Sequence, residues 1–203
     1  SCIDIEGNIY ETVDIGEQEW MAENLKATLF QNGDEIPLAF YQINENQSFD
    51  NNVYGNLYEW HAVNDGRNIC PEDWHVPSDE EFIEMEIYLG MDPGEAFLNG
   101  VMRGTDEGGR LKATGTIEAG NGLWHEPNYG ATNETGFSAI PAGYQWFDGD
   151  ILQNGYVARY WSSFESSDFS AWGRGLMYGE SGIYRTQWDK NAGFSVRCIK
   201  DSQ

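Results

Sequence analysis

From Gly104 to the C-terminus, the sequence shows no helical periodicity, and short aromatic-rich runs alternate with turns of Gly, Asn and Asp. The runs that we expect to form strands are 137–140, 144–147, 156–161, 171–177, 183–188 and 194–199. The 24 glycines spread along the 203 residues disfavour long helices, and the 14% aromatic content favours a core of large flat side chains. This half of the chain therefore predicts short strands joined by irregular loops.

The clearest helix start lies before this region, at Ser78 and Glu81. These two residues have the spacing of a capping box, in which each side chain accepts a hydrogen bond from the other residue's backbone N–H. The apolar residues that follow at helical spacing are Phe82, Met85 and Leu89. A weaker helical stretch follows at 95–101. Helices early and strands late predict the α+β class.

The first 56 residues are expected to form a hairpin and a long polar loop. Alternating apolar residues flank a turn at 6–8, and 18–21 reads as a second short strand. The stretch 54–63 fits either a strand or a short helix. No linker or repeat is visible, so we expect a single domain over 1–203, with the hairpin and loop in 1–56 and the core in 57–203.

The charge balance limits the partners. The chain has 34 Asp and Glu against 11 Lys and Arg, a net charge of −23. Nucleic-acid binding and anionic membranes are disfavoured, because both need clustered cations. An acidic surface keeps a protein in solution, and it also attracts cations. No apolar stretch approaches the roughly 20 residues of a membrane span.

The three cysteines are Cys2, Cys70 and Cys198. Their spacing suits neither a zinc site nor an iron–sulfur site, and their number allows one long-range disulfide with one cysteine left over. A Ser directly before a Cys matches the sequence pattern of a bacterial lipoprotein cleavage site. Cys2 is therefore a candidate lipid anchor, although ordered-looking sequence follows at once where an anchor normally precedes a flexible linker.

No catalytic motif is present around the three histidines. We expect His75, just before the helix, to be a half-buried structural histidine. A catalytic pair of Cys70 and His75 is the alternative, but a cysteine in an extracellular-looking chain is more often bridged than nucleophilic. The expectation is that the protein is not an enzyme.

The triplet Glu126-Pro127-Asn128 is the one with which sugar-binding C-type lectins hold calcium and a mannose-type ligand. Carboxylate and amide oxygens are suitable calcium ligands, so Glu126 and Asn128 are candidate metal ligands. Trp188-Asp189-Lys190 lacks the Trp-Asn-Asp arrangement expected downstream. A plain turn is the alternative interpretation, and no other cofactor is indicated.

Aromatic residues in loops next to Gly and Asn are candidates for stacking on sugar rings or anchoring a protein partner. The interpretation as ordinary core residues stays open for each of them. The ligand-binding candidates are Trp124, Glu126, Asn128 and Trp146.

Motifs along nearly the whole chain resemble, in order, the Fibrobacter succinogenes major paralogous domain. They are EGNIY (6–10), QEWMAENL (18–25), YGNLYEW (54–60), CPEDWHVPSD (70–79), GRLKATG (109–115), NYGATNETGF (128–137), YWSS (160–163) and GFSVRC (193–198). That family occurs in secreted and surface proteins, often lipoproteins, of Fibrobacter and Bacteroidetes-type bacteria, and its molecular role is largely undefined.

The family looks related to C-type-lectin-like folds of the formylglycine-generating type. The resemblance implies a helix packed on a twisted antiparallel sheet, with long irregular loops carrying any binding site, and it suggests a Cys70–Cys198 disulfide. This chain departs from the family pattern at Asp73, where Gly is common, and at His125-Glu126, where small polar residues are common. The cysteine arrangement of the formylglycine-generating enzymes is not visible, which argues against oxidase activity.

Together these features lead us to expect a non-catalytic, secreted or surface-anchored module that binds a glycan or a surface protein. Its location would be extracellular or at the outer-membrane surface. The alternatives are a structural subunit of a cell-surface assembly and, less favoured, a hydrolase with convergent carboxylates.

Overall fold

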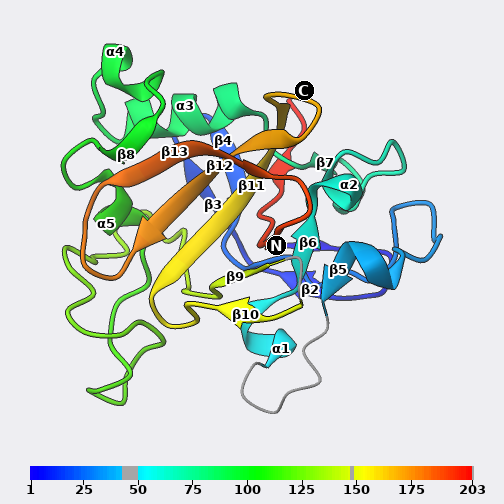
Figure 1. The fold of residues 1–203 in the computed structure, drawn as a ribbon, viewed down its shortest axis with the longest axis horizontal. Helices are drawn as coiled ribbons and strands as arrows, with labels where there is room; N and C mark the ends of the chain where they lie inside the picture. The colour runs from blue at the N-terminus through cyan, green and yellow to red at the C-terminus, as the bar shows by residue number, and fades with distance from the viewer. Residues whose placement is uncertain (43–49, 147–148, 203) are drawn as a thin grey trace.

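The computed structural model describes residues 1–42, 50–146 and 149–202. Within these ranges the fold is mixed but mostly β, with short helices around four antiparallel sheets (Figure 1). This agrees with the α+β class. The largest sheet has the order β11–β12–β13–β8, and its strands are β11 (Val157–Glu165), β12 (Ser170–Met177), β13 (Ile183–Asp189) and β8 (Gly100–Arg103).

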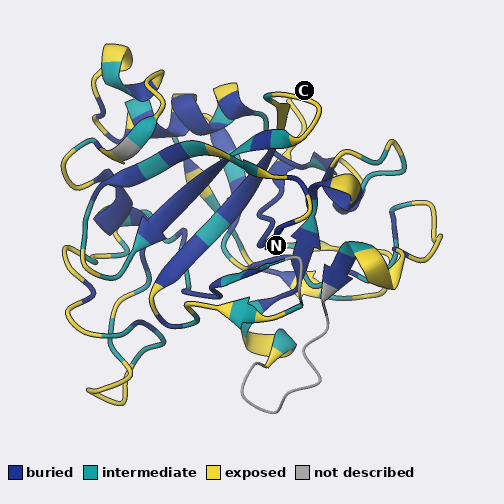
Figure 2. Cartoon of the chain, viewed as in Figure 1, coloured by how far each residue is buried: buried dark blue, intermediate teal, exposed yellow. Residues whose placement is uncertain are grey.

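Helix α3 (Asp79–Tyr88) runs along the top of this sheet in Figure 1. It begins at the predicted capping box: Ser78 Oγ accepts from the Glu81 backbone N–H at 3.2 Å, and Glu81 Oε2 accepts from that of Ser78 at 2.7 Å. Phe82 and Met85 are buried on its inner side. Figure 2 shows buried residues along the strands of the largest sheet and exposed residues in the surrounding loops.

Buried charges also join α3 to the sheet. Asp79 accepts from Arg174 on β12 at 2.7 Å and from Arg185 on β13 at 2.5 Å. Glu86, which lies further along α3 and is fully buried, accepts from Arg103 on β8 at 2.9 Å. Because each of these carboxylates meets guanidinium groups, the burial of their charge is compensated.

Two further sheets bring the ends of the chain together. One has the order β10–β9–β14–β6–β5, with strands β10 (Ile151–Leu152), β9 (Tyr144–Gln145), β14 (Gly193–Phe194), β6 (Leu57–Glu59) and β5 (Tyr41–Gln42). The other has the order β3–β4–β15–β7, with β3 (Thr12–Ile15), β4 (Gln18–Met21), β15 (Ile199–Lys200) and β7 (Trp74–His75). Residues from 1–56 thus pair directly with later strands. The fourth sheet is the predicted N-terminal hairpin, β1 (Cys2–Ile3) and β2 (Ile9–Tyr10).

The remaining helices are short: η1 (Leu38–Phe40), α1 (Asn51–Tyr54), α2 (Trp60–Val63), α4 (Pro93–Ala96) and α5 (Glu107–Leu111). The predicted helix over 95–101 is wrong beyond α4, because the chain continues into β8. Helix α5 was not predicted. Its Gly108 and Gly109 pack so closely on the backbone carbonyls of Gly182 and Gly130 that any side-chain carbon would collide. The stretch 54–63 contains both a strand, β6, and a helix, α2.

The strand predictions succeed for the long strands β11, β12 and β13. The run 137–140 forms only an isolated bridge at Ala139, and 194–199 is divided between β14 and β15. In the run 144–147 the strand is β9, and Phe147 lies outside the described residues. The divided run contains Arg197, which is fully buried and donates to Asn24 Oδ1 at 2.7 Å and to the Ser138 carbonyl at 3.0 Å.

The disulfide Cys70–Cys198 is confirmed, and Cys2 is a free cysteine, partly buried in β1. The bridge ties the segment before β7 to the segment before β15. Because Cys70 is bridged, a catalytic Cys70–His75 pair is excluded. His75 is half-buried and bonded through both ring nitrogens, as a structural histidine would be.

Candidate functional site

Residues 112–143 connect α5 to β9 through loops, and Lys112 fixes them to the sheet. Its ammonium group donates to the backbone carbonyls of Tyr129 at 2.8 Å, Met177 at 3.0 Å and Glu180 at 2.8 Å. The residue is fully buried, and this burial lowers the pKa of Lys112 to about 8. A single side chain thereby holds the loop at Tyr129 against the end of β12.

Trp124 lies in the core and not on the surface. Its side chain is fully buried, and Nε1 donates to the Ala139 carbonyl at 3.0 Å. The Lys112 ammonium lies 5.3 Å from the centre of its ring. The expectation that Trp124 faces a ligand is therefore wrong: its indole fills the space beneath the loop.

Four other aromatic residues lie on backbone segments that hydrogen-bond to one another, and we call them the aromatic platform: His125, Tyr129, Tyr156 and Tyr178. The rings of His125 and Tyr156 stack with centres 4.2 Å apart and planes 26° apart. Tyr178 meets Tyr156 edge-on, with the centres 5.1 Å apart. Tyr129 and Tyr156 are exposed by 59% and 40% of their surface. The platform thus exposes aromatic side-chain surface to solvent.

The backbone holds the platform in place. The His125 N–H donates to the Gly155 carbonyl at 2.8 Å, and the Tyr178 N–H donates to that of Tyr156 at 2.9 Å. The Tyr129 N–H donates to the Tyr178 carbonyl at 2.7 Å. Three segments far apart in sequence are therefore joined directly under the rings, and little ordering of the backbone would be required on binding.

A carboxylate borders the platform at Glu118. His125 Nδ1 lies 2.6 Å from its Oε1, and the Glu126 backbone N–H donates to Oε2 at 2.9 Å. The hydrogen bond from His125 holds the pKa of Glu118 below its usual value. An ionised acceptor therefore stands beside the stacked rings.

The predicted calcium ligands lie next to the platform, and the peptide bond between Glu126 and Pro127 is cis. The Glu126 side chain is exposed. Asn128 is buried, and its amide nitrogen donates to the carbonyls of Ala113 and Gly115 at 3.0 Å each. Its Oδ1 has no hydrogen-bond partner. Among the described residues, no group of three or more His, Cys, Asp or Glu side chains is placed to hold a metal ion.

Trp146 lies in a different setting, directly after β9. It is partly buried, packs against the hydrophobic core and meets Tyr144 edge-on with the ring centres 6.3 Å apart. Of the four predicted contact residues, the structure therefore places Glu126 and Asn128 by the platform. Sequence analysis passed over Tyr156 as a contact, although it follows a glycine and so carried the same signal as the residues that were chosen.

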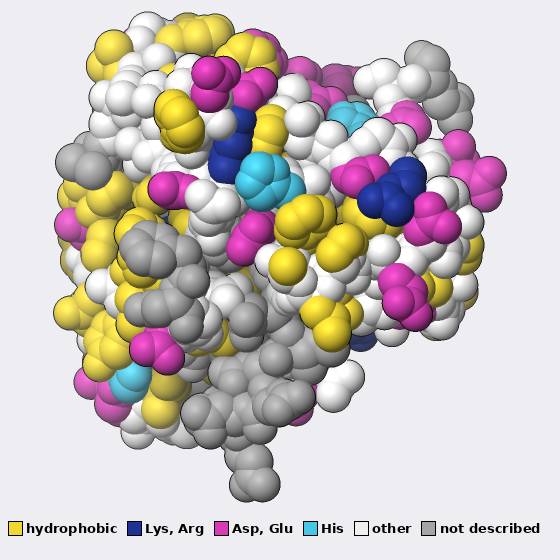
Figure 3. Space-filling view, turned by 45° about the vertical axis from the view of Figure 1, so that its right-hand side comes forward, with side chains coloured by type: hydrophobic (Ala, Val, Ile, Leu, Met, Phe, Trp, Pro, Cys, Tyr) yellow, Lys and Arg dark blue, Asp and Glu magenta, His cyan; other side chains and the backbone are white. Residues whose placement is uncertain are grey.

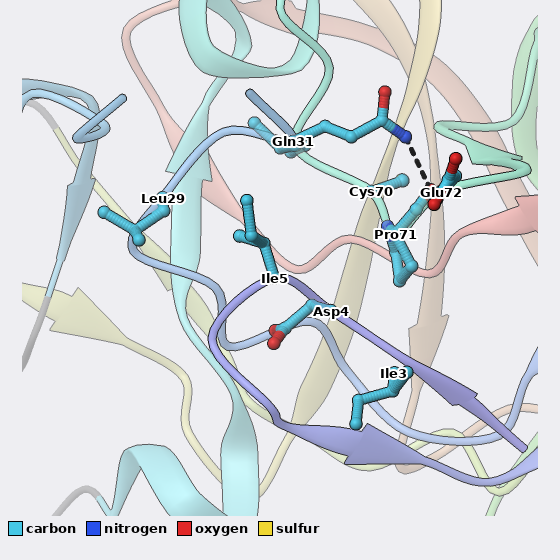
Figure 4. A pocket seen from close by; sticks show the side chains of 9 residues that line it. Ile3, Asp4, Ile5, Leu29, Gln31, Cys70, Pro71 and Glu72 are labelled. Atoms are coloured by element: carbon cyan, nitrogen blue, oxygen red, sulfur yellow. Dashed lines mark hydrogen bonds between the residues drawn. The ribbon is translucent and has the colours of Figure 1, made fainter. Parts of the chain in front are cut away.

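A first surface pocket adjoins the disulfide and has a volume of about 470 Å³ (Figure 4). Ile3 and Ile5 of the N-terminal hairpin face Leu29 and Pro71 across it. The Asp4 carboxylate at its wall already accepts from the backbone N–H groups of 6 and 8 and from two side chains. The pocket therefore combines these apolar side chains with the polar side chains of Gln31 and Glu72.

The second pocket, of about 580 Å³, is acidic. The carboxylates that line it are Asp14, Glu17, Glu19, Glu81, Glu84 and Asp201. Lys200 donates to Glu19 at 2.7 Å, and this hydrogen bond lowers the pKa of Glu19. Glu59 is the one carboxyl group in the described part of the chain whose pKa is raised, and it lines neither pocket. Figure 3 shows acidic side chains spread among hydrophobic ones, with few Lys or Arg side chains.

The fold and these surfaces define a β-rich α+β domain with a helix on an antiparallel sheet and a loop-borne aromatic surface. The chain belongs to the Fibrobacter succinogenes major domain family, whose model matches residues 13–200. Searches of curated proteins and of solved structures return no significant match. None of the helices within the described ranges has the length and apolar character to cross a membrane.

Proposed function

We propose that the protein is a non-catalytic binding module that holds a neutral glycan against the aromatic platform. The stack of His125 on Tyr156, with Tyr129 exposed beside it, carries the proposal. A pyranose ring has an apolar C–H face that packs on an aromatic ring, and its hydroxyl groups need acceptors at the edge. The ionised Glu118 is such an acceptor.

The wider assignment is part of the same proposal. A helix on an antiparallel sheet with long loops supports a C-type-lectin-like fold. The Cys70–Cys198 disulfide supports an extracellular or outer-membrane location, because disulfides persist in oxidising compartments. Attachment would be through a lipid on Cys2, and calcium would bind at Glu126 and Asn128 with further oxygens from solvent or sugar.

The test is binding of a panel of neutral oligosaccharides to the purified chain, followed by isothermal titration with the best ligand. Tyr156→Ala should weaken binding more than about tenfold, since stacked rings supply much of the affinity of such surfaces. Tyr88→Ala is the matched control, because Tyr88 is a tyrosine with 65% of its surface exposed on α3, outside the platform. Equal binding by both variants, or no binding of any neutral sugar, would reject the proposal.

A chelator arm tests the metal separately. If calcium bridges the glycan, EDTA should abolish binding and added calcium should restore it, and Glu126→Gln should mimic EDTA. Binding that EDTA leaves unchanged would remove calcium from the proposal and retain the platform.

A second candidate, a structural subunit of a cell-surface assembly, is favoured by the N-terminal hairpin. Ile3, Ile5 and Ile9 are exposed by 60%, 55% and 59% beside the first pocket. Exposed apolar clusters of this kind commonly mark protein contacts. Cross-linking on intact cells should then trap a partner with the wild-type chain, and Ile5→Asp should prevent it.

A further inference from the structure

The guanidinium group of Arg159, on β11, is stacked among aromatic rings. Its central carbon lies 3.8 Å from the ring centre of Tyr144, 5.3 Å from that of Trp188 and 5.5 Å from that of Phe194. These rings come from β9, β13 and β14, so strands of two sheets converge on one cation. Because a guanidinium is attracted to the faces of aromatic rings, this arrangement, the Arg159 cluster, fixes the orientation of the side chain.

What distinguishes Arg159 is the lack of an acceptor. Every other arginine bonds to a side-chain acceptor: Arg67 to Asp65, Arg103 and Arg174 to Glu86, Arg110 to Glu134, Arg185 to Asp79 and Arg197 to Asn24. Within the described ranges, the guanidinium group of Arg159 has neither a hydrogen bond nor an ion pair. This holds in a chain with 34 acidic residues, so acceptors are not scarce.

The N–H groups of Arg159 are nevertheless accessible. Among the described residues, the buried side-chain nitrogen and oxygen atoms without a partner are Arg103 Nε, Asn128 Oδ1 and the Tyr160 hydroxyl. Arg159 is partly buried and contributes no atom to this set, so its unpaired N–H groups reach the surface. Burial disfavours the charged form of Arg159 and so lowers its pKa, and a bound anion would offset this effect.

Two glycines on the neighbouring strand let the Trp188 ring pack closely beside the cluster. Gly175 on β12 stands opposite Arg159, and Gly173 precedes it on the same face. The Trp188 ring covers both glycines: a side-chain carbon would lie 3.0 Å from the ring at Gly173 and 3.8 Å from it at Gly175. The Trp188 ring therefore packs along β12 next to the guanidinium.

We propose that the Arg159 cluster is a binding site for an acidic sugar, in which the guanidinium pairs with the oxyanion and the Trp188 and Tyr144 rings pack against the pyranose. The planar guanidinium matches a carboxylate through two parallel N–H donors, and it also pairs with sulfate. The site is separate from the aromatic platform, so it goes beyond the proposed function and stands whether or not the platform binds a neutral sugar.

The first test compares ligands on the wild-type chain. Trigalacturonate should bind in isothermal titration, and its methyl ester, which has the same rings without the charge, should bind more than about tenfold more weakly. A sulfated galactose oligosaccharide distinguishes sulfate from carboxylate as the source of the oxyanion. Equal binding of the acid and the ester, or no binding of either acidic sugar, would overturn the proposal without any variant.

The second test uses matched variants. Arg159→Lys keeps the charge but loses the paired donors, and Arg159→Met keeps the length of the side chain; each should lose trigalacturonate binding by about tenfold or more. Arg67→Met is the control, because Arg67 also stacks on a ring, 4.0 Å from the centre of Phe30, but is paired with Asp65 and Asp34. Tyr156→Ala should leave this binding unchanged. Unaltered binding in a folded Arg159→Lys protein would refute the site.

Discussion

The ammonium group of Lys112 lies 2.8 Å from the backbone carbonyl of Tyr129, although the two residues are 17 positions apart in the sequence. The loop between them carries Trp124. The same nitrogen bonds to carbonyls 65 and 68 residues further along. An ammonium group has three donors, and all three are used on carbonyls of two separate segments. Lys112 is thus a structural support of the platform, and it touches no ligand itself.

Replacing this support should cost stability and binding together. Lys112→Met leaves three partly buried carbonyls without their donor, and we expect a loss of about 2–4 kcal/mol in the free energy of unfolding. Urea denaturation measures it. Lys200→Met is the control: its partner Glu19 is partly exposed and Lys200 itself is exposed, so the change should stay below about 1 kcal/mol. Equal losses in the two variants would contradict the assigned role.

The Cys70–Cys198 disulfide should make a large contribution to the free energy of unfolding. Cys70 and Cys198 are 128 residues apart, and a loop of this length corresponds to about 5 kcal/mol of stabilisation in the chain-entropy model. The double variant Cys70→Ser, Cys198→Ser should therefore unfold at much lower urea concentration. Cys2→Ser should change the free energy of unfolding by less than about 1 kcal/mol. A midpoint in the double variant equal to that of Cys2→Ser would show that the bridge contributes nothing.

The buried ion pairs make a third prediction. Burial raises the pKa of Asp79, but the hydrogen bonds from Arg185 and Arg174 outweigh it, so the carboxyl group is ionised and its pKa lies below the usual value. Asp79→Asn would leave two guanidinium groups buried without this charge, at a cost of about 3–5 kcal/mol. The same substitution at exposed Asp34, which also pairs with an arginine, should cost less than about 1 kcal/mol. Thermal or urea unfolding of the two variants decides.

Local signals were enough to predict part of this fold. The capping box of Ser78 and Glu81 acts within four residues, and the long strands β11 to β13 follow from their own composition. The disulfide followed from the resemblance to the family. Asp73 has a φ of 65°, in the left-handed region that favours glycine, which agrees with the Gly that the family resemblance implies there.

The platform could not be predicted in this way. Trp124 lies two residues after a glycine and Tyr156 directly after one, yet one ring is fully buried and the other is 40% exposed. The difference depends on which side of the loop packs against the sheet. Lys112 fixes this packing by donating to backbone carbonyls that are distant in sequence. The unpaired state of Arg159 is equally a product of tertiary packing, since no local pattern shows which arginine lacks an acceptor.

His75 should make stability depend on pH. The hydrogen bond to Glu81 raises its pKa most, burial opposes this, and Asp201 adds to the increase, giving a pKa of about 8 against 6.5 for the free side chain. Because the folded-state pKa is the higher one, the contribution is fully present below pH 6.5 and is lost as pH rises through 8. We expect about 1 kcal/mol, since the ring is about a third exposed. His75→Gln should remove this pH dependence, whereas His61→Gln should retain it.

Glu59 should also make the protein less stable as pH rises, but over a lower pH range than His75. Burial, with a smaller effect from the charge of Asp189, raises the pKa of Glu59 to about 7 from 4.5. The folded state therefore favours the protonated carboxyl group, and stability present below pH 4.5 is lost as pH rises through 7. Glu59→Gln imitates the protonated form at every pH. It should leave the free energy of unfolding nearly unchanged at about pH 4 and raise it by about 1–2 kcal/mol at about pH 8, measured by urea denaturation.

Asp189→Asn should produce a smaller gain at about pH 8, because it removes only the minor cause of the raised pKa and leaves the burial of Glu59 in place. A Glu59→Gln variant that gains equally at both pH values would show that folding does not raise the pKa of this carboxyl group.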